Sequence, residues 1–234
     1  MTLRLNLFGS LLFTFSSLCL AGAAPDTRAV SELGSPRTVI FELRAGNGER
    51  LPDAAVVVTG EHTEPHPSTQ GTAIMSQVNE RFEPDFVVVE AGASVAFPNN
   101  DRVMHHVYSF SQARQFEIPL YQDEQPSPIR FDRSGVVIVG CNIHDQMIGT
   151  IVVTDTPYFA MTDERGRAAV PVPAGATTVD LWYRKGERYV RTERAIPSKA
   201  LASTRGRRVT FTIDDATSSA STTADSALEW NEDY

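Results

Sequence analysis

Short β-type segments follow one another along the sequence, and they limit the possible fold more than any other feature does. Each segment is rich in Val, Ile and aromatic residues, and Gly, Pro, Asn or Asp closes it. No stretch of a dozen or more residues has a convincing helical period. Short strands at this spacing favour an all-β fold, an antiparallel sandwich or barrel. The clearest segments are 38–43, 55–59, 86–89, 94–97, 103–110, 136–139 and 150–154.

The first 23 residues have the features of an export signal. Arg4 supplies a positive charge, residues 11–20 are almost wholly apolar, and Ala21-Gly22-Ala23 is a cleavage site of the A-x-A type. The apolar run is too short to span a bilayer comfortably, and no later segment resembles a membrane helix. We therefore expect a soluble, periplasmic protein that is exported through this signal and has no membrane span.

Composition divides the rest of the chain into a linker at 24–37, a first domain at 38–155, a small β module at 156–213 and a tail at 214–234. The tail holds six acidic residues and no basic ones among Ser, Thr and Ala, which predicts disorder. By contrast, residues 184–208 hold nine basic residues against two acidic ones. Such uneven charge argues against nucleic acid as a partner and favours contacts through local patches. We expect a monomer that meets a redox partner protein whose identity the sequence does not give.

Cys141 becomes the only cysteine once the signal is removed, because the other cysteine is Cys19. A lone thiol in an exported protein cannot form an intramolecular disulfide, so it needs another role. His144 and Met147 follow it at intervals of three residues. In a tight turn of about three residues, side chains at this spacing share one side. Thiolate, imidazole and thioether together favour a soft metal, with copper as the first candidate.

A fourth ligand is offered by the segment 97–107, in which a polar turn containing Asn99 precedes His105 and His106. Neighbouring residues of a strand point to opposite faces, so only one of the two histidines reaches a given metal. His62 and His66 lie in the Pro-rich stretch 60–71 and are expected to be solvated. Met75 is expected to fill core space rather than to bind metal.

A catalytic Cys141–His144 pair is the rival interpretation. Such a pair needs an orienting carboxylate and an oxyanion hole. The neighbouring Asp145 is expected to point away from the ring of His144, and no Gly-rich strand–turn–helix elbow surrounds Cys141. We therefore predict that the protein is not an enzyme.

The two halves of this pattern resemble the cupredoxins, the small blue-copper electron carriers. An aromatic-x-Asn segment followed six residues later by a ligand histidine is their upstream half, which puts the ligand role on His105. His106 stands where cupredoxins usually have an Asn that braces the ligand loop, and Asn99 and Asn142 are expected to support the site with it. The Cys-x2-His-x2-Met loop is similar to the shortest cupredoxin loop, that of the amicyanins.

The closer resemblance is to exported cupredoxin-like proteins of the methylamine-utilisation type. It is carried by HHVYSFS, GCNIHD and TPYF, although members of that group typically have Trp at the position of Gln146. The segment 158–182 resembles the transthyretin-like modules of carboxypeptidase regulatory domains. The resemblance implies a Greek-key β-sandwich, a mononuclear copper site of His105, Cys141, His144 and Met147, and one-electron transfer between Cu(I) and Cu(II). The alternatives are a copper-binding or copper-delivery protein without a redox role, and a structural β-sandwich whose metal site is vestigial.

Overall fold

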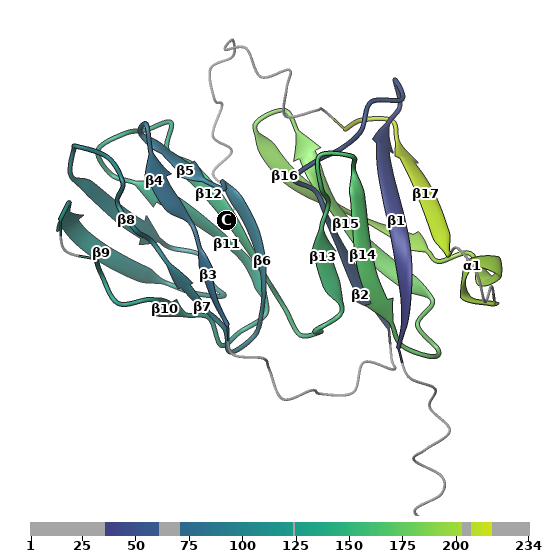
Figure 1. Ribbon diagram of the computed structural model, residues 1–234. Helices are drawn as coiled ribbons and strands as arrows, with labels where there is room; N and C mark the ends of the chain where they lie inside the picture. The colour runs from purple at the N-terminus through teal and green to yellow at the C-terminus, as the bar shows by residue number, and fades with distance from the viewer. Residues whose placement is uncertain (1–35, 61–70, 124, 203–206, 217–234) are drawn as a thin grey trace, which may run out of the picture. The chain divides into compact units, whose positions relative to one another are not determined.

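The computed structural model describes residues 36–60, 71–123, 125–202 and 207–216. The expected export signal, the stretch with His62 and His66, and all but the start of the tail lie outside the described residues. Within them, regular structure is almost entirely strand, which confirms the all-β prediction (Figure 1). The strands are β1 (Arg37–Ala45), β2 (Ala55–Thr59), β3 (Thr72–Ile74), β4 (Ser76–Val78), β5 (Arg81–Glu83), β6 (Phe86–Glu90), β7 (Ser94–Ala96), β8 (His105–Ser109), β9 (Phe116–Tyr121), β10 (Ile129–Arg130), β11 (Gly135–Cys141), β12 (Ile148–Thr154), β13 (Phe159–Met161), β14 (Arg167–Val172), β15 (Thr178–Lys185), β16 (Arg188–Ala195) and β17 (Arg208–Ile213), with a short helix α1 (Ser198–Ala202).

The strands β3 to β12 form a first sandwich, which we call the central sandwich. One sheet has the order β6-β12-β11-β8-β9, and β10-β7-β3 with the β4–β5 hairpin lies opposite. In β11, Val137, Val139 and Cys141 are buried while Val136 and Ile138 are exposed, as the two-residue period of a strand requires. The inward-facing set closes a core that also contains Met75, Phe82, Val95, Phe97, Val107, Phe131, Met147 and Ile151.

The remaining strands form a second sandwich, which we call the flanking sandwich. Its sheets have the orders β14-β1-β17 and β13-β2-β15-β16. The sequence-based boundary at residue 38 assigned β1 and β2 to the first domain, and strand pairing corrects this. β1 pairs with β14 and β17, and β2 pairs with β13 and β15. The physical reason is burial, since Val39, Phe41 and Leu43 of β1 are fully covered by the core of this sandwich.

Side chains of the two sandwiches also pack on each other. Phe86, Val88 and Val152 of the central sandwich form one apolar cluster with residues of β2 and β15. The ring of Phe86 stacks on that of Tyr189 with centroids 4.0 Å apart. Because β6 is covered on both faces, all five of its residues are buried, and its first four, 86–89, form a continuous apolar run rather than an alternating pattern.

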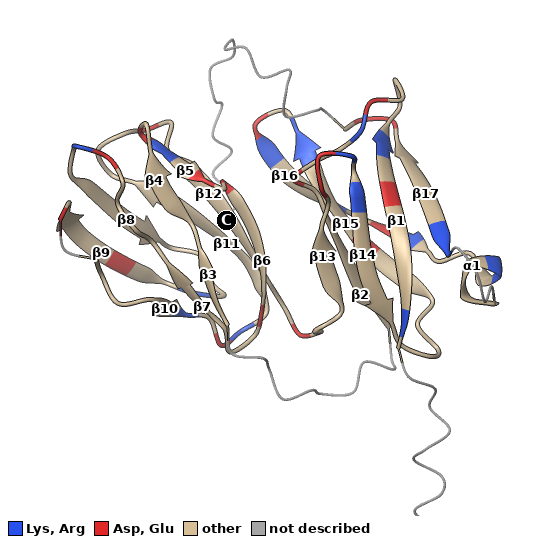
Figure 2. Ribbon diagram, viewed as in Figure 1, with Lys and Arg blue, Asp and Glu red and all other residues tan. Residues whose placement is uncertain are grey.

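Charge is distributed unevenly over the described residues. Figure 2 shows Lys and Arg along β16 and at the start of β17, within the segment 184–208 that the sequence singles out as basic. Asp215, in the first part of the acidic tail, accepts hydrogen bonds from Tyr183 Oη and Lys185 Nζ, each at 2.9 Å. No helix in the described part of the chain is long and apolar enough to cross a membrane.

Candidate metal centre

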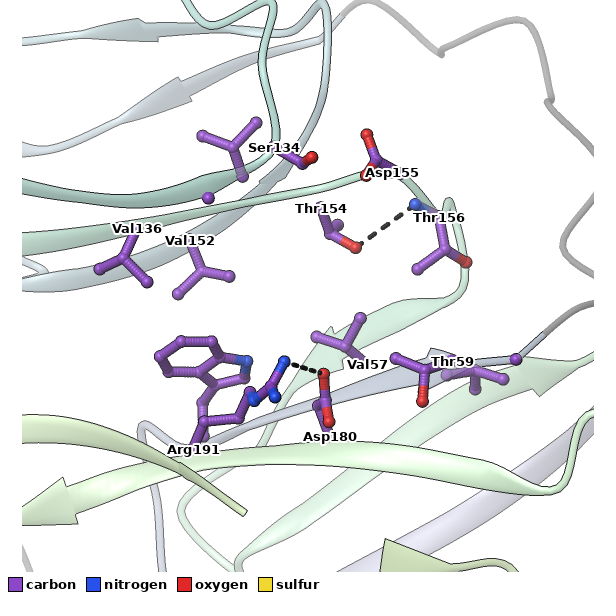
Figure 3. Close-up of a pocket in the computed structure, with 15 residues that line it drawn as sticks. Val57, Thr59, Ser134, Val136, Val152, Thr154, Asp155, Thr156, Asp180 and Arg191 are labelled. Atoms are coloured by element: carbon purple, nitrogen blue, oxygen red, sulfur yellow. Dashed lines mark hydrogen bonds and ion pairs between the residues drawn. The ribbon is translucent and has the colours of Figure 1, made fainter. Parts of the chain in front are cut away.

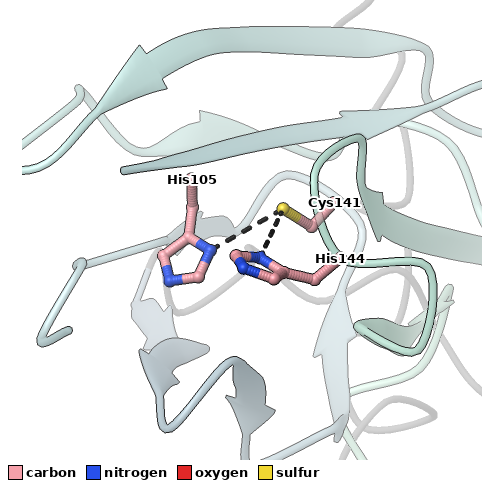
Figure 4. Close-up of side chains that lie close together, drawn as sticks. All are labelled: His105, Cys141 and His144. Atoms are coloured by element: carbon pink, nitrogen blue, oxygen red, sulfur yellow. Dashed lines mark hydrogen bonds between the residues drawn. The ribbon is translucent and has the colours of Figure 1, made fainter. Parts of the chain in front are cut away.

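Three potential metal ligands converge in the central sandwich (Figure 4). His105 is the first residue of β8, Cys141 is the last of β11, and His144 lies in the loop that follows. The Sγ of Cys141 is 3.7 Å from Nδ1 of His105 and 3.7 Å from Nδ1 of His144. One ligand atom from each residue lies within 4.8 Å of the others. His105 and Cys141 are buried, and His144 is half-buried.

The hairpin between β11 and β12 explains how Cys141 and His144 meet. The Cys141 N–H donates to the carbonyl of Met147 at 3.1 Å, which closes the loop at its base. The Met147 N–H donates to the carbonyl of His144 at 2.9 Å, which forms a turn that folds the loop back on itself. The sequence predicted a tight turn over Cys141, His144 and Met147, and the structure shows a hairpin loop closed by these two hydrogen bonds.

Met147 lies at the end of this loop, beside Cys141. Its side chain is 1% exposed and belongs to the same core cluster as Cys141. Met147 is therefore buried in the core that also holds Cys141. Met75 is also fully buried in this core, where its Sδ packs against Gly149.

The two histidines of β8 have separate environments. His105 is fully buried, whereas His106 points to the opposite face, where its Nε2 lies 2.8 Å from Oε1 of Glu117. Strand alternation predicts this division, and spacing from Asn99 selects His105 as the inward one. The structure brings His105 together with Cys141 and His144, and it leaves His106 outside the cluster.

Asn99 braces the loop before β8. Its side-chain amide donates to the carbonyls of Val103 (2.9 Å) and Tyr121 (3.0 Å), and its Oδ1 accepts from the Asp101 N–H (2.9 Å). Burial is the main reason that the pKa of Tyr121 is raised to about 12, so its hydroxyl keeps a proton and donates to the carbonyl of Phe97. Asn142 is exposed and contributes through its backbone, donating to the carbonyl of His106 at 3.2 Å.

The sequence does not reveal two carboxylates behind the histidines. Oδ2 of Asp101 lies 2.8 Å from Nε2 of His105, and Oε2 of Glu80 lies 3.7 Å from Nε2 of His144. Burial raises the pKa of Asp101, but hydrogen bonds from the Glu80 N–H, from His105 and from the Asn79 N–H outweigh it and leave that pKa below its usual range. The Asp four residues before His105 is visible in the sequence, but the loop shape that joins the two is not.

The donor atoms fit a soft metal ion such as copper. With bond lengths of about 2.0 Å to nitrogen and about 2.3 Å to sulfur, ligands about 120° apart place N and S about 3.7 Å from each other, whereas tetrahedral ligands place them about 3.5 Å apart. The 3.7 Å from Sγ to each Nδ1 allows one metal ion to bind all three atoms. Two imidazoles and a thiolate, with a methionine in the same core, are the donor types of blue-copper sites.

A cavity of about 540 Å³ lies elsewhere, between residues of the two sandwiches (Figure 3). Its walls include Val57, Val136 and Val152. Asp180 lines it, held by Arg191 Nη1 at 3.3 Å, and Oδ1 of Asp180 has no hydrogen-bond partner among the described residues. Burial raises the pKa of Asp180; Arg191 acts in the opposite direction. The cavity shares no lining residue with the His105–Cys141–His144 cluster.

Neither a protein-family model nor a curated protein sequence matches the chain. Among solved structures, it is similar to a purple cupredoxin from Nitrosopumilus maritimus, with 19% identity, 35% of this chain and 99% of that chain covered, and a TM-score of 0.32. A reduced amicyanin variant has 19% identity over 42% of this chain and 98% of that chain, with a TM-score of 0.34. A copper-containing nitrite reductase from Thermus scotoductus has 24% identity over 42% of this chain and 24% of that chain, with a TM-score of 0.33. Each likeness covers less than half of this chain.

Proposed function

We propose that this protein binds one copper ion through His105, Cys141, His144 and Met147 and carries single electrons. The observation that supports this most directly is the position of Cys141 Sγ, buried and 3.7 Å from one nitrogen of each histidine. Bound copper would supply the Cu(I)/Cu(II) couple, and a thiolate in this donor set stabilises both states.

The chain's own contribution is to hold the ligands still. β8 and β11 pair with each other at Val107 and Cys141, so the ligands His105 and Cys141 stand on adjacent strands of one sheet. The hairpin hydrogen bonds described above restrain His144 and Met147. Ligands that move little between oxidation states keep the reorganisation energy low, which an electron carrier requires.

The burial of Cys141 also favours metal binding over thiol catalysis. Its side chain is 4% exposed and faces two imidazoles, whereas a nucleophile needs access to its substrate. We therefore propose a carrier rather than an enzyme. Export to the periplasm, a monomeric state and the relation to methylamine-utilisation-type proteins are part of this proposal, and they rest on the sequence motifs.

Copper delivery is the second candidate function. The side chain of His144 is 22% exposed, so one ligand of the site is open to solvent and to a partner that exchanges metal. Delivery needs a site that releases its ion, whereas electron transfer needs one that keeps it.

A visible spectrum of the copper-loaded protein distinguishes the two functions. An intense thiolate-to-copper band that bleaches reversibly on reduction supports the carrier, and weak ligand-field colour alone supports delivery. Cys141→Ser keeps the size of the side chain and removes the soft thiolate, so the band should vanish while the far-UV circular dichroism of the β fold is unchanged. An intense band that survives in Cys141→Ser would show that the site is assigned wrongly.

A further inference from the structure

A two-residue turn lies close to the Nε2 atoms of both His105 and His144, on the side of each ring away from Cys141. Val78 pairs with Arg81 across the β4–β5 hairpin, which leaves Asn79 and Glu80 as the turn. Both have positive φ, 53° and 58°, as the central residues of a type I′ turn do. Asn tolerates this region, but Glu has no such preference, so the turn needs support from outside the hairpin.

Asp101 gives that support. Its carboxylate accepts the N–H of Asn79 at 2.6 Å and the N–H of Glu80 at 2.9 Å. Its own N–H donates to Asn99 Oδ1. The side chain is 11% exposed and is therefore held between the turn and the loop before β8. Its Oδ2 then has one remaining neighbour, Nε2 of His105 at 2.8 Å.

This contact determines which nitrogen of His105 carries the proton. An ionised carboxylate only accepts hydrogen bonds, so the proton lies on Nε2. The lone pair of Nδ1 is then free on the side that faces Cys141 Sγ. Asp101 thus prepares His105 to bind a metal through Nδ1 before any metal arrives.

Glu80 extends the arrangement to the second histidine. Its Oε2 lies 3.7 Å from Nε2 of His144, beyond a hydrogen bond but close enough for its charge to act. The turn therefore places one carboxylate behind each imidazole. Its backbone N–H groups hold the carboxylate of Asp101 beside His105, and the side chain of Glu80 itself lies beside His144.

We propose that Asp101 is a positioning residue that fixes the tautomer of His105 and, with Glu80, biases the site toward Cu(II). This rests on the proposed copper function for its second half only. A carboxylate that accepts a hydrogen bond from a ligating histidine makes that ligand more basic, and removing such a partner typically costs about 10–100-fold in metal affinity. Extra negative charge favours the more positive oxidation state, so loss of the carboxylate should weaken Cu(II) more than Cu(I).

The chain contains a matched control for this proposal. Glu117 Oε1 lies 2.8 Å from Nε2 of His106, the same pair of groups at the same distance on the neighbouring residue of β8. It faces away from the cluster. Glu117→Gln therefore removes a carboxylate–imidazole contact without touching the site.

The first measurement uses metal-free protein and long-range ¹⁵N–¹H NMR of the histidine rings. The wild type should show His105 protonated on Nε2 alone, and Asp101→Ala should give a mixture of tautomers. Asp101→Asn retains an acceptor oxygen and should retain the Nε2–H form. A wild-type His105 protonated on Nδ1 would overturn the proposal, whether or not copper binds.

The second measurement is the reduction potential of copper-loaded protein. Asp101→Asn should weaken Cu(II) relative to Cu(I) about tenfold, which raises the potential by about 59 mV for one electron. Glu80→Gln leaves its backbone N–H in place, so it should raise the potential by a smaller amount while amide exchange of the turn stays slow. Glu117→Gln should change nothing. Equal shifts in Asp101→Asn and Glu117→Gln would refute the bias toward Cu(II).

The two arms separate the possible failures. If no intense copper band forms in the wild type, the proposed function fails while the tautomer result still tests Asp101. If the band forms and the potentials of all three variants equal the wild type, the tuning role fails alone. Should Asp101→Ala not fold, Asp101→Asn and Glu80→Gln decide the outcome.

Discussion

His105 and His106 are consecutive residues of β8 that point to opposite faces of one sheet, and Nε2 of each lies 2.8 Å from a carboxylate oxygen that accepts its hydrogen bond. Asp101 serves the inward ring and Glu117 the outward one. The side chain of Glu117 is 70% exposed, whereas that of Asp101 is 11% exposed. Two identical side chains, one residue apart, therefore differ in solvent exposure and in neighbours.

Loss of each histidine should have a different effect on the copper spectrum. His105→Ala should abolish the blue band because it removes a ligand atom 3.7 Å from Cys141 Sγ. His106→Ala should only weaken or shift the band, since the ring of His106 contacts Glu117 outside the cluster and the backbone bond from Asn142 to the His106 carbonyl is retained. Spectra of the two loaded variants decide this. If His106→Ala lost the band and His105→Ala only weakened it, His106 would be the ligand instead.

Asn99→Ala should destabilise the fold and loosen the site together. It removes three hydrogen bonds in a buried position, each worth about 0.5–1.5 kcal/mol, so we expect a loss of about 2–3 kcal/mol. Urea unfolding should show a lower midpoint with an unchanged slope. The exposed neighbour Asn100 is the control, because Asn100→Ala retains the backbone bond to Gln77 and should leave the midpoint in place.

Local sequence signals predicted the strands well, and the proximity of Cys141 and His144 follows from their positions in one short loop. β2, β6 and β12 are strongly apolar and closed by turn residues, and Cys141, His144 and Met147 lie within one seven-residue loop, so little beyond local order was needed. The domain boundary was wrong because β1 carries the same apolar signal whichever sheet it joins. Its partners β14 and β17 are more than 120 residues away, and pairing over that distance leaves no local mark.

The contact between Asp101 and His105 was missed for a related reason. On a regular strand, residues four apart would lie too far from each other to bond. The turn 99–103 folds the chain back, and that turn depends on Asn99 and on the β4–β5 hairpin. Neither dependence can be recognised from the residues between Asp101 and His105.

Gly149→Ala should overpack the central core. A Cβ at this position would lie 2.9 Å from Met75 Sδ and 3.3 Å from Phe82 Cδ2, so Met75 must move. We expect a loss of about 1–2 kcal/mol in the free energy of unfolding. Met75→Val should recover part of it when combined with Gly149→Ala, although it destabilises on its own. Additive losses in the double-mutant cycle would exclude this contact as the cause.

Asp180→Asn should stabilise the protein at neutral pH. Burial raises the pKa of Asp180 in the folded state above the ordinary value of 3.8, so folding binds the proton more tightly and the ionised form costs stability. That cost is absent below the unfolded pKa and grows as pH rises through the folded one. The variant should gain about 1 kcal/mol at pH 7, because the amide keeps an oxygen for Arg191 and removes the charge of a carboxylate whose Oδ1 has no hydrogen-bond partner among the described residues.

Unfolding in urea from pH 7 to below pH 4 checks the pH dependence. The stability that Asp180→Asn gains over the wild type should decrease as the pH is lowered, and it should vanish once the wild-type carboxyl is protonated. Asp155→Asn, at an exposed carboxylate of the same cavity, should leave the free energy of unfolding unchanged at every pH. An advantage that stays constant with pH would point to packing instead of charge.

Removal of the acidic tail should speed electron transfer to an anionic acceptor. Asp215 already binds Lys185 and Tyr183, and the sequence that follows, residues 217–234, contains four more acidic residues. Exposed charges act over about 8 Å at physiological salt, so the effect should appear at low salt and fade at high salt.

Ferricyanide oxidation of the reduced protein across a salt series measures this effect. Three chains are compared: the full length, one that ends at Ala216 and one that ends at Ile213. The chain that ends at Ala216 retains Asp215 and should show most of the gain, because it has already lost four of the six carboxylates. If the three chains are oxidised at the same rate at low ionic strength, the tail has no effect on electron transfer.

The pairing of β1 with β14 and β17 has a consequence for the order in which the chain folds as it is synthesised. β1 and β2 emerge first, yet their partners come only after residue 158, so their apolar faces wait while more than 100 residues follow. The central sandwich has all its strands between Thr72 and Thr154 and can close during that wait. The sandwich that carries His105, Cys141 and His144 therefore has all its strands before β1 and β2 have their partners, and the apolar faces of β1 and β2 stay uncovered the longest.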